Sequence, residues 1–172
     1  MPIGASHAAV RVSLILPLEH YYARGILTGI QKAVFPHNLS AAADVSLKDR
    51  PGRLSDLPWV FSIHGGSPRG PALERLFSDL NRWKPDLVIA RIEETKLANF
   101  LKDLTIPVVE IYNEGKWDNF ISVNIDDLAI GRLGAEHFID RGYSHFAFIG
   151  SFHYKFVTDR LNGFQARLAE TG

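Results

Sequence analysis

An α/β fold with a doubly wound, mostly parallel sheet is expected from this sequence for two reasons. Short apolar, β-branched segments alternate with segments whose apolar residues recur every three or four positions, and this alternation is typical of parallel strands joined by helices. The chain also has 172 residues, of which 46% are hydrophobic, and a chain of this size forms about one domain with a substantial core. A Rossmann-like lobe is therefore the predicted architecture.

The first strand and helix are predicted over residues 9–16 and 19–34. The strand segment is apolar and mostly β-branched, as in a strand covered on both faces, and Pro17 ends it. The helix segment has an apolar residue at every fourth position, which places these residues on one helix face. They are Tyr22, Ile26, Ile30 and Val34. Residues 35–58 mix prolines with scattered polar residues and are predicted to form an irregular insertion, and residues 1–8 are predicted to be disordered.

The alternation of strand and helix patterns continues along the rest of the chain. Further strands are predicted over residues 59–64, 86–92, 106–112, 121–125 and 145–150. Further helices are predicted around residues 73–80, 97–104, 126–141 and 157–168. The helix over 126–141 is expected to end at Gly142. It is expected to bury Ile130, Leu133, Gly134, His137 and Phe138.

Composition excludes several classes of protein. The 19 Lys and Arg residues balance 19 Asp and Glu residues, so the chain as a whole has no charge excess that would favour nucleic acid or anionic lipid. The absence of Cys excludes disulfides and thiolate nucleophiles and fits a reducing compartment. No apolar run approaches the length of a membrane span, and the first residues lack the pattern of a signal peptide. A cytoplasmic protein that does not contact the membrane is expected.

Candidate binding residues come directly after the predicted strands, because ligands of such sheets bind beyond the carboxyl ends of the strands. The candidates in the first part of the chain are Glu19, Tyr22, Arg24, Arg91, Glu93 and Asn113, with His20, Glu94 and Tyr112 at similar positions. Carboxylates, guanidinium groups and aromatic rings suit a small polyhydroxylated ligand better than a phosphate. Two alternatives stay open, since Tyr22 also belongs to the apolar helix stripe and Arg24 also fits an exposed helix position.

Known catalytic motifs are missing from the sequence. Residues 65–71 are glycine-rich, but Pro71 stands where a phosphate-binding loop needs Lys. The dinucleotide-binding glycine pattern does not follow the first strand, and neither a nucleophile elbow nor an H-E-x-x-H metal motif occurs. The seven His residues are scattered. A binding protein without cofactor or metal is therefore expected rather than an enzyme.

Two sets of residues carry a resemblance to a known family. The first set is Val123, Asn124, Ile125, Asp126, Asp127, Gly131, Ala135, His137, Phe138, Arg141, Gly142, Phe146, Phe148, Ile149, Gly150, Arg160, Gly163 and Phe164. It resembles the pattern of LacI/GalR-type sensor domains, which have the type I periplasmic-binding-protein fold. The second set is Tyr22, Arg24, Gly25, Ile26, Leu27 and Gly29. It looks like the start of the sensor in xylose-operon regulators, where an AraC-type DNA-binding domain follows, and no headpiece precedes Val10.

The resemblance implies a domain organisation and a function. Residues 9–142 would form the N-terminal lobe of a two-lobed sensor, and residues 143–172 the first strand and helix of a C-terminal lobe that is otherwise absent, as is the DNA-binding domain. The implied ligand is a small sugar, such as the pentose xylose, which controls DNA binding allosterically in a homodimer. The alternatives are a sugar- or nucleotide-processing enzyme and a periplasmic sugar receptor. The missing catalytic motifs weigh against the enzyme, and the missing signal peptide weighs against the receptor.

The resemblance also implies binding roles for four residues in the last third of the chain. Asp126 would contact the ligand from a strand end, although a helix N-cap is an equally good explanation. Arg160 would reach a sugar hydroxyl, although it could also be a solvated helix arginine beside Asp159. Tyr154 and Phe156 occupy a loop where the family places aromatic rings over the sugar, and their alternative role is to anchor that loop.

Overall fold

The computed structural model describes residues 9–34, 58–112 and 117–171. The chain divides into two compact units, and the boundary between them follows Val123. Unit 1 holds the described residues up to Val123, and unit 2 holds residues 124–171. The expected disordered segment 1–8, the expected insertion at 35–58 apart from its last residue, and the candidate Asn113 lie outside the described residues.

Unit 1 contains a five-stranded sheet in which every pairing is parallel. Its strands are β1 (Val10–Leu16), β2 (Trp59–Gly65), β3 (Leu87–Ala90), β4 (Val108–Ile111) and β5 (Ile121–Val123), and they lie in the order β2-β1-β3-β4-β5. The predicted α/β class and doubly wound parallel sheet are confirmed, and the first five predicted strands form close to their predicted ends.

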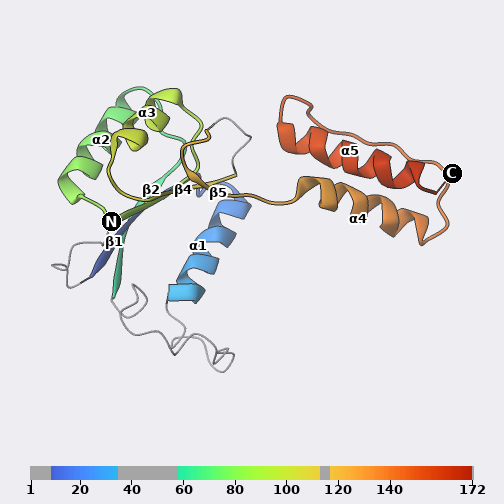
Figure 1. Cartoon of the computed structure of the whole chain (residues 1–172), viewed down its shortest axis with the longest axis horizontal. Helices are drawn as coiled ribbons and strands as arrows, with labels where there is room; N and C mark the ends of the chain where they lie inside the picture. The colour runs from blue at the N-terminus through green and yellow to red at the C-terminus, as the bar shows by residue number, and fades with distance from the viewer. Residues whose placement is uncertain (1–8, 35–57, 113–116, 172) are drawn as a thin grey trace. The chain divides into compact units, whose positions relative to one another are not determined.

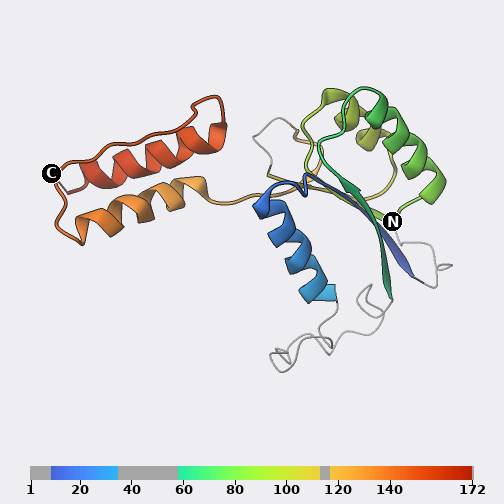
Figure 2. The same ribbon diagram turned by 180° about the vertical axis from the view of Figure 1, so that it is seen from behind.

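Helices cover both faces of this sheet (Figures 1 and 2). Helix α1 (Tyr21–Val34) lies on one face, whereas α2 (Pro71–Trp83) and α3 (Thr95–Asp103) lie on the other. Alternate side chains of a strand point to opposite faces, so Leu14 and Leu16 pack beneath α1 while Ile15 packs beneath α2 and α3. These side chains belong to two apolar clusters, one on each face of the sheet. The predicted apolar stripe of α1 is confirmed by Tyr22, Ile26 and Ile30, which pack against the cluster that contains Leu14 and Leu16.

The strand order creates a switch point at the carboxyl ends of β1 and β3. The chain passes from β1 to β2 through α1 and then returns through α2 to β3, on the other side of β1. The two connections therefore leave the carboxyl edge of the sheet in opposite directions, and the crevice between them is where ligands bind in open parallel sheets. This edge is where the predicted candidates of unit 1 are expected to meet.

Unit 2 consists of α4 (Asp127–Ile139), α5 (Lys155–Ala169) and the segment between them, which runs back along α5 (Figures 1 and 2). The helix α4 ends at Ile139 with Asp140 as its C-cap, earlier than the predicted end at Gly142. Gly142 lies in the turn that follows, where it has a left-handed φ of 77° and donates its N–H to the carbonyl of Ile139. None of the helices in the described ranges is long and apolar enough to cross a membrane.

The predicted strand over residues 145–150 is wrong. Phe146 and Phe148 contact Phe164 of α5, whereas Ile149, which follows Phe148, is 96% exposed. Side chains thus alternate as they do in a strand with one covered face. However, a strand is defined by hydrogen bonds to a neighbouring strand, and no other described segment pairs with this one.

The predicted buried face of α4 is also wrong. Leu133 is 63% exposed, and Ile130, His137 and Phe138 are exposed as well. The residues that α4 buries are Gly131 and Ala135. A Cβ on Gly131 would lie 1.9 Å from the carbonyl oxygen of Arg160, and one on Gly163 would lie 2.1 Å from that of Leu128. The helix backbones touch at these glycines, so the smallest residues form the contact rather than the largest apolar ones.

The contact between α4 and α5 yields a test of stability. Gly131→Ala and Gly163→Ala each place a methyl group against backbone, and such overpacking should destabilise unit 2 by about 1–3 kcal/mol. Gly134→Ala is the matched control, because its Cβ would meet only a ring atom of Phe164 at 3.8 Å and replacing a helical glycine gains about 0.5–1 kcal/mol. Amide hydrogen exchange in α4 and α5 measures the difference. Equal exchange rates in all three variants would contradict the close contact.

The pH dependence of stability should depend in part on His64 in β2. Burial lowers the pKa of His64, and the nearby carboxylate of Asp79 only partly opposes this effect. The ring Nε2 lies 3.0 Å from Ser62 Oγ. Because the unfolded chain then binds this proton more readily than the folded chain, unit 1 should lose stability as the pH falls through about 6.5. Urea denaturation between pH 7.5 and 5.5 should show a shallower loss for His64→Gln, and an unchanged slope would assign the effect to another group.

Candidate functional site

The candidate site of unit 1 lies where the loops after β1 and β3 meet. The N–H of Arg91 donates to the carbonyl of Ile15 at 3.0 Å, which fixes the loop after β3 beside the end of β1. Tyr22 stands in the first turn of α1, directly after the β1 loop. Arg91 Nη1 donates a hydrogen bond to the Tyr22 hydroxyl across 69 positions of the sequence. The structure therefore joins two of the predicted candidates.

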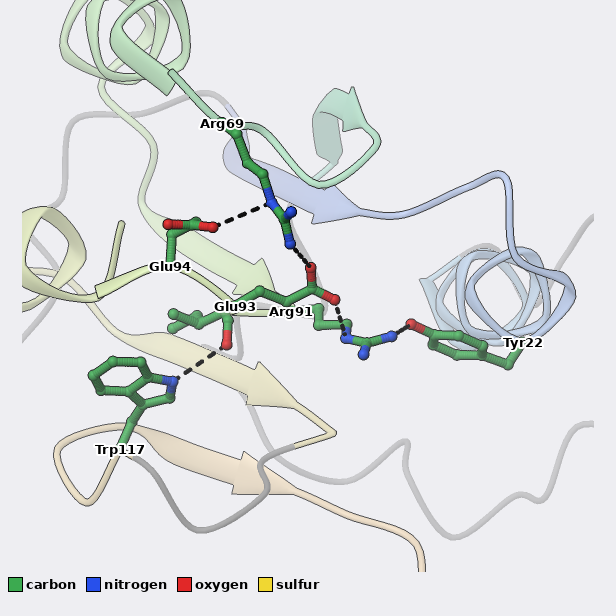
Figure 3. A network of polar contacts seen from close by, with 7 residues as sticks. Tyr22, Arg69, Arg91, Glu93, Glu94 and Trp117 are labelled. Atoms are coloured by element: carbon green, nitrogen blue, oxygen red, sulfur yellow. Dashed lines mark hydrogen bonds and ion pairs between the residues drawn. The ribbon is translucent and has the colours of Figure 1, made fainter. Parts of the chain in front are cut away.

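A chain of ion pairs extends from this contact (Figure 3). Arg91 Nε lies 2.9 Å from Glu93 Oε1, Arg69 Nη2 lies 3.8 Å from Glu93 Oε2, and Arg69 Nε lies 3.1 Å from Glu94 Oε1. The exposed fraction of the side chain rises from 16% for Arg91 to 28% for Glu93 and 69% for Arg69. Arg91 is thus a largely buried charge, and Glu93 supplies the compensation that such a charge needs.

Aromatic rings surround the Arg91 guanidinium. Its Cζ lies 5.5 Å from the ring centroid of Tyr22 and 5.2 Å from that of Tyr112, and both distances are typical of cation–π contacts. The rings of Tyr22 and Tyr112 stack with their centroids 5.5 Å apart, and the ring of His20 stacks on that of Tyr22 at 5.8 Å. Tyr112 has a left-handed φ of 67°. This conformation is rare for an aromatic residue and is found more often at functional sites.

One hydrogen bond and two glycine turns determine the course of the loops. Trp117 Nε1 donates to the carbonyl of Ile92 at 3.2 Å and so anchors the loop after β3 (Figure 3). The loop after β2 carries Arg69 to the same edge, and its turns use left-handed backbone at Gly66, with φ 84°, and Gly70, with φ 52°. Only glycine adopts such angles without a steric cost. The glycine-rich segment therefore shapes a turn and presents an arginine.

The arrangement leaves hydrogen-bonding capacity for a ligand. Within the described part of the chain, Arg91 Nη2 has no hydrogen-bond partner, and Glu93 Oε2 has only the 3.8 Å contact with Arg69, which is too long for a hydrogen bond. The structure thus offers a donor on Arg91, whose guanidinium lies beside two tyrosine rings, and an acceptor on Glu93, with which Arg91 pairs. Such a set matches the hydroxyl groups and C–H surfaces of a small polar ligand.

The remaining candidates of unit 1 lie beside this cluster. Arg24 Nη1 donates to the carbonyls of Leu18 and Glu19 at 2.8 and 3.0 Å, and its guanidinium lies over the ring of Tyr21. Arg24 is exposed and stabilises the loop before α1, which agrees with the exposed helix position considered above. Glu19 is exposed in the same loop. Ligand contacts by Glu19 and Arg24 stay predictions.

The four candidates of unit 2 form a separate group. Asp126 caps α4 by accepting from the N–H of Ala129 at 2.9 Å. Arg160 Nε lies 2.8 Å from Asp127 Oδ1 rather than beside Asp159, and its Cζ lies 5.1 Å from the ring centroid of Phe156. The rings of Tyr154 and Phe156 stack at 5.4 Å. The helix-cap role of Asp126 is present, while contacts of all four residues with a ligand stay predictions.

Sequence reasoning missed Arg69. The only signal was its position between β2 and α2 at the carboxyl edge, because the glycine-rich segment was tested against phosphate-binding motifs alone. Among the described residues, no group of three His, Asp or Glu side chains converges as a metal site.

Comparisons with known proteins bear on the fold. No family model matches the sequence, and no curated protein matches it significantly. Solved structures do match, including the transcription regulator CcpA of Lactococcus lactis, with a TM-score of 0.66 at 21% identity over 95% of this chain and 54% of that chain. A periplasmic binding protein/LacI transcriptional regulator from Alkaliphilus metalliredigens, complexed with D-xylulofuranose, matches with a TM-score of 0.60 at 14% identity over 95% of this chain and 53% of that chain.

A third match is the transcriptional regulator CelR in complex with cellobiose, with a TM-score of 0.61 at 18% identity over 96% of this chain and 47% of that chain. The chain has the fold of type I periplasmic-binding-protein domains. This likeness extends to LacI/GalR-type regulators and confirms that part of the predicted resemblance. The chain spans about half the length of the structures that it matches.

The cap of α4 gives a test that separates a structural role of Asp126 from a binding role. Asp126→Ala removes the oxygen that accepts from Ala129 N–H and should destabilise α4 by about 0.5–2 kcal/mol, whereas Asp126→Asn keeps a cap of similar strength. Hydrogen exchange in the first turn of α4 measures this effect in the full chain. Equal protection in the alanine variant and the unsubstituted chain would contradict the capping role.

Proposed function

We propose that this chain is the ligand-sensing portion of a sugar-responsive bacterial transcription regulator and that it binds a small sugar. The observation that carries the proposal is the cluster of Tyr22, Arg91 and Glu93 at the switch point of the sheet. Ligands of open parallel sheets bind at this point. The cluster also has the chemical groups that a sugar requires.

A sugar presents hydroxyl groups at its edge and C–H groups on its faces. Arg91 Nη2 donates to a hydroxyl oxygen, and Glu93 Oε2 accepts from a hydroxyl group, so the pair engages two neighbouring hydroxyls of one ligand. The stacked rings of Tyr22 and Tyr112 supply apolar surface for the C–H groups. Both ligand-binding side chains are held in position before the ligand arrives, which lowers the entropic cost of binding.

The similar structures support a regulatory role. CcpA and CelR are transcription regulators, and the CelR structure contains cellobiose. In the proposed mechanism, the sugar favours one arrangement of the sensor and thereby changes how a separate DNA-binding domain meets its operator. The formal net charge of zero fits a chain that does not itself contact DNA. Such a regulator acts in the cytoplasm.

The identity of the sugar and of the assembly forms the finer part of the proposal. The Alkaliphilus metalliredigens protein binds D-xylulofuranose, a five-carbon sugar, and this supports a pentose such as xylose as the ligand. A homodimer is proposed because operators are commonly two-fold symmetric. An AraC-type DNA-binding domain gains no support from the similar structures, whose names point to LacI-like regulators and binding proteins.

Residues 143–172 are proposed to begin a second lobe, and residues 9–142 to belong to the first. The exposed side chain of Ile149 supports this, because an apolar residue in an extended segment is usually covered by a neighbouring layer. The greater length of the similar structures supports it too. Ligand contacts by Asp126, Tyr154, Phe156 and Arg160 are also part of the proposal.

Calorimetry of the full chain tests sugar binding. Titration with D-xylose, L-arabinose, D-ribose and D-glucose should give saturable heat for at least one sugar. Arg91→Ala should weaken that binding at least tenfold, since a hydrogen bond to a charged group contributes about 1.5–3 kcal/mol.

Arg82→Ala is the matched control for this experiment. Arg82 is an exposed arginine of α2 that pairs with Asp79 at 2.5 Å, outside the cluster, so its removal should leave the dissociation constant unchanged. The absence of saturable heat with every sugar, or equal losses in the two arginine variants, would contradict the proposed function.

A further inference from the structure

The charges at the candidate site cancel. Arg91 and Arg69 contribute two positive charges, and Glu93 and Glu94 contribute two negative ones, all joined in the chain of ion pairs shown in Figure 3. The pair at the centre of the cluster is Arg91 with Glu93, because Arg69 and Glu94 are the more exposed members of the chain. Exposed charges are screened by water and salt. The charge that a ligand meets beside Arg91 is therefore set mainly by Glu93.

The hydrogen bonds of Arg91 also determine which ligands its guanidinium accepts. A carboxylate or phosphate normally binds arginine through two parallel hydrogen bonds, which use either Nε with Nη2 or Nη1 with Nη2. Glu93 occupies Nε, and the Tyr22 hydroxyl occupies Nη1. One N–H group of Nε and one of Nη1 are thus already in use. Within the described part of the chain, Nη2 keeps both of its N–H groups and Nη1 keeps one, so the Nε edge is closed to a paired contact while single N–H groups stay available to a hydroxyl oxygen.

We propose that Glu93 is a specificity-determining residue that makes this site select uncharged sugars and reject phosphorylated or acidic ones. The inference rests on the proposed function and adds the charge class of the ligand. Glu93 acts in two ways, since it blocks one edge of the guanidinium and its own largely buried negative charge repels an anion that approaches Arg91.

The test compares the full chain with Glu93→Gln, a substitution that keeps the size and the acceptor oxygen but removes the charge. Calorimetry with D-ribose and D-ribose 5-phosphate gives a dissociation constant for each ligand. In the unsubstituted chain the phosphate ester should bind at least tenfold more weakly than the sugar. In Glu93→Gln the ratio of the two constants should shift at least tenfold toward the phosphate ester.

Glu94→Gln is the matched control, because this substitution changes the net charge of the chain by the same amount, whereas Glu94 pairs with Arg69 instead of Arg91. Its ratio should stay within about threefold of the unsubstituted value, as expected for an exposed, screened charge. An equal shift in both variants would overturn the proposal in favour of a general effect of net charge. A ratio that does not change in Glu93→Gln would also overturn it.

A second variant tests the edge argument even if Glu93→Gln fails to fold. Tyr22→Phe frees the N–H group of Nη1 that the hydroxyl occupies without changing any charge, so all N–H groups of Nη1 and Nη2 become available, and D-ribose 5-phosphate should bind at least threefold more tightly than before. Unchanged or weaker binding would overturn the role of the occupied edges. If the variants bind D-ribose 5-phosphate more tightly while the unsubstituted chain binds no sugar, the charge selectivity holds and the proposed sugar-sensing function fails.

Discussion

The parallel pairing of β1 with two neighbours determines the arrangement of unit 1. β1 forms hydrogen bonds with β2 along one side and with β3 along the other, and its alternate side chains enter the two apolar clusters. Because both pairings are parallel, the loops after all three strands emerge at one edge. The opposite directions of the connections then open this edge between β1 and β3. The candidate site occupies that position as a consequence of the sheet.

A largely buried arginine at this edge places a second constraint on the structure. A guanidinium that leaves water needs hydrogen bonds and a compensating charge. Arg91 is contacted by Tyr22, Glu93 and Tyr112, and these residues come from three separate segments of the chain. The same contacts that stabilise the charge also fix the orientation of the guanidinium. Stabilisation of the charge and the proposed binding specificity therefore depend on the same side chains.

Unit 2 follows a different packing principle. Its two helices approach so closely at Gly131 and Gly163 that backbone touches backbone, and this close approach excludes larger side chains. The apolar residues Ile130 and Leu133 consequently lie on another face of α4. Their spacing predicts a buried helix face, but a spacing pattern states only which residues favour burial. It does not state which neighbouring element covers them.

Local sequence patterns predict the α/β class, the positions of the first five strands and the candidate residues Tyr22, Arg91 and Glu93. These predictions are possible because the period of apolar residues distinguishes helix from strand and because the residues after each strand lie at the carboxyl edge of the sheet. The wrong strand at 145–150 marks the limit of such patterns, because an apolar alternating segment still requires a partner to form a ladder.

Local patterns do not predict the strand order, the contact between Tyr22 and Arg91, the position of Arg69 or the stacked, left-handed Tyr112; these features became visible in the folded chain. Each depends on hydrogen bonds and packing between segments far apart in the chain. The sequence order of strands does not specify which of them become neighbours, and the neighbours determine which side chains meet at the carboxyl edge.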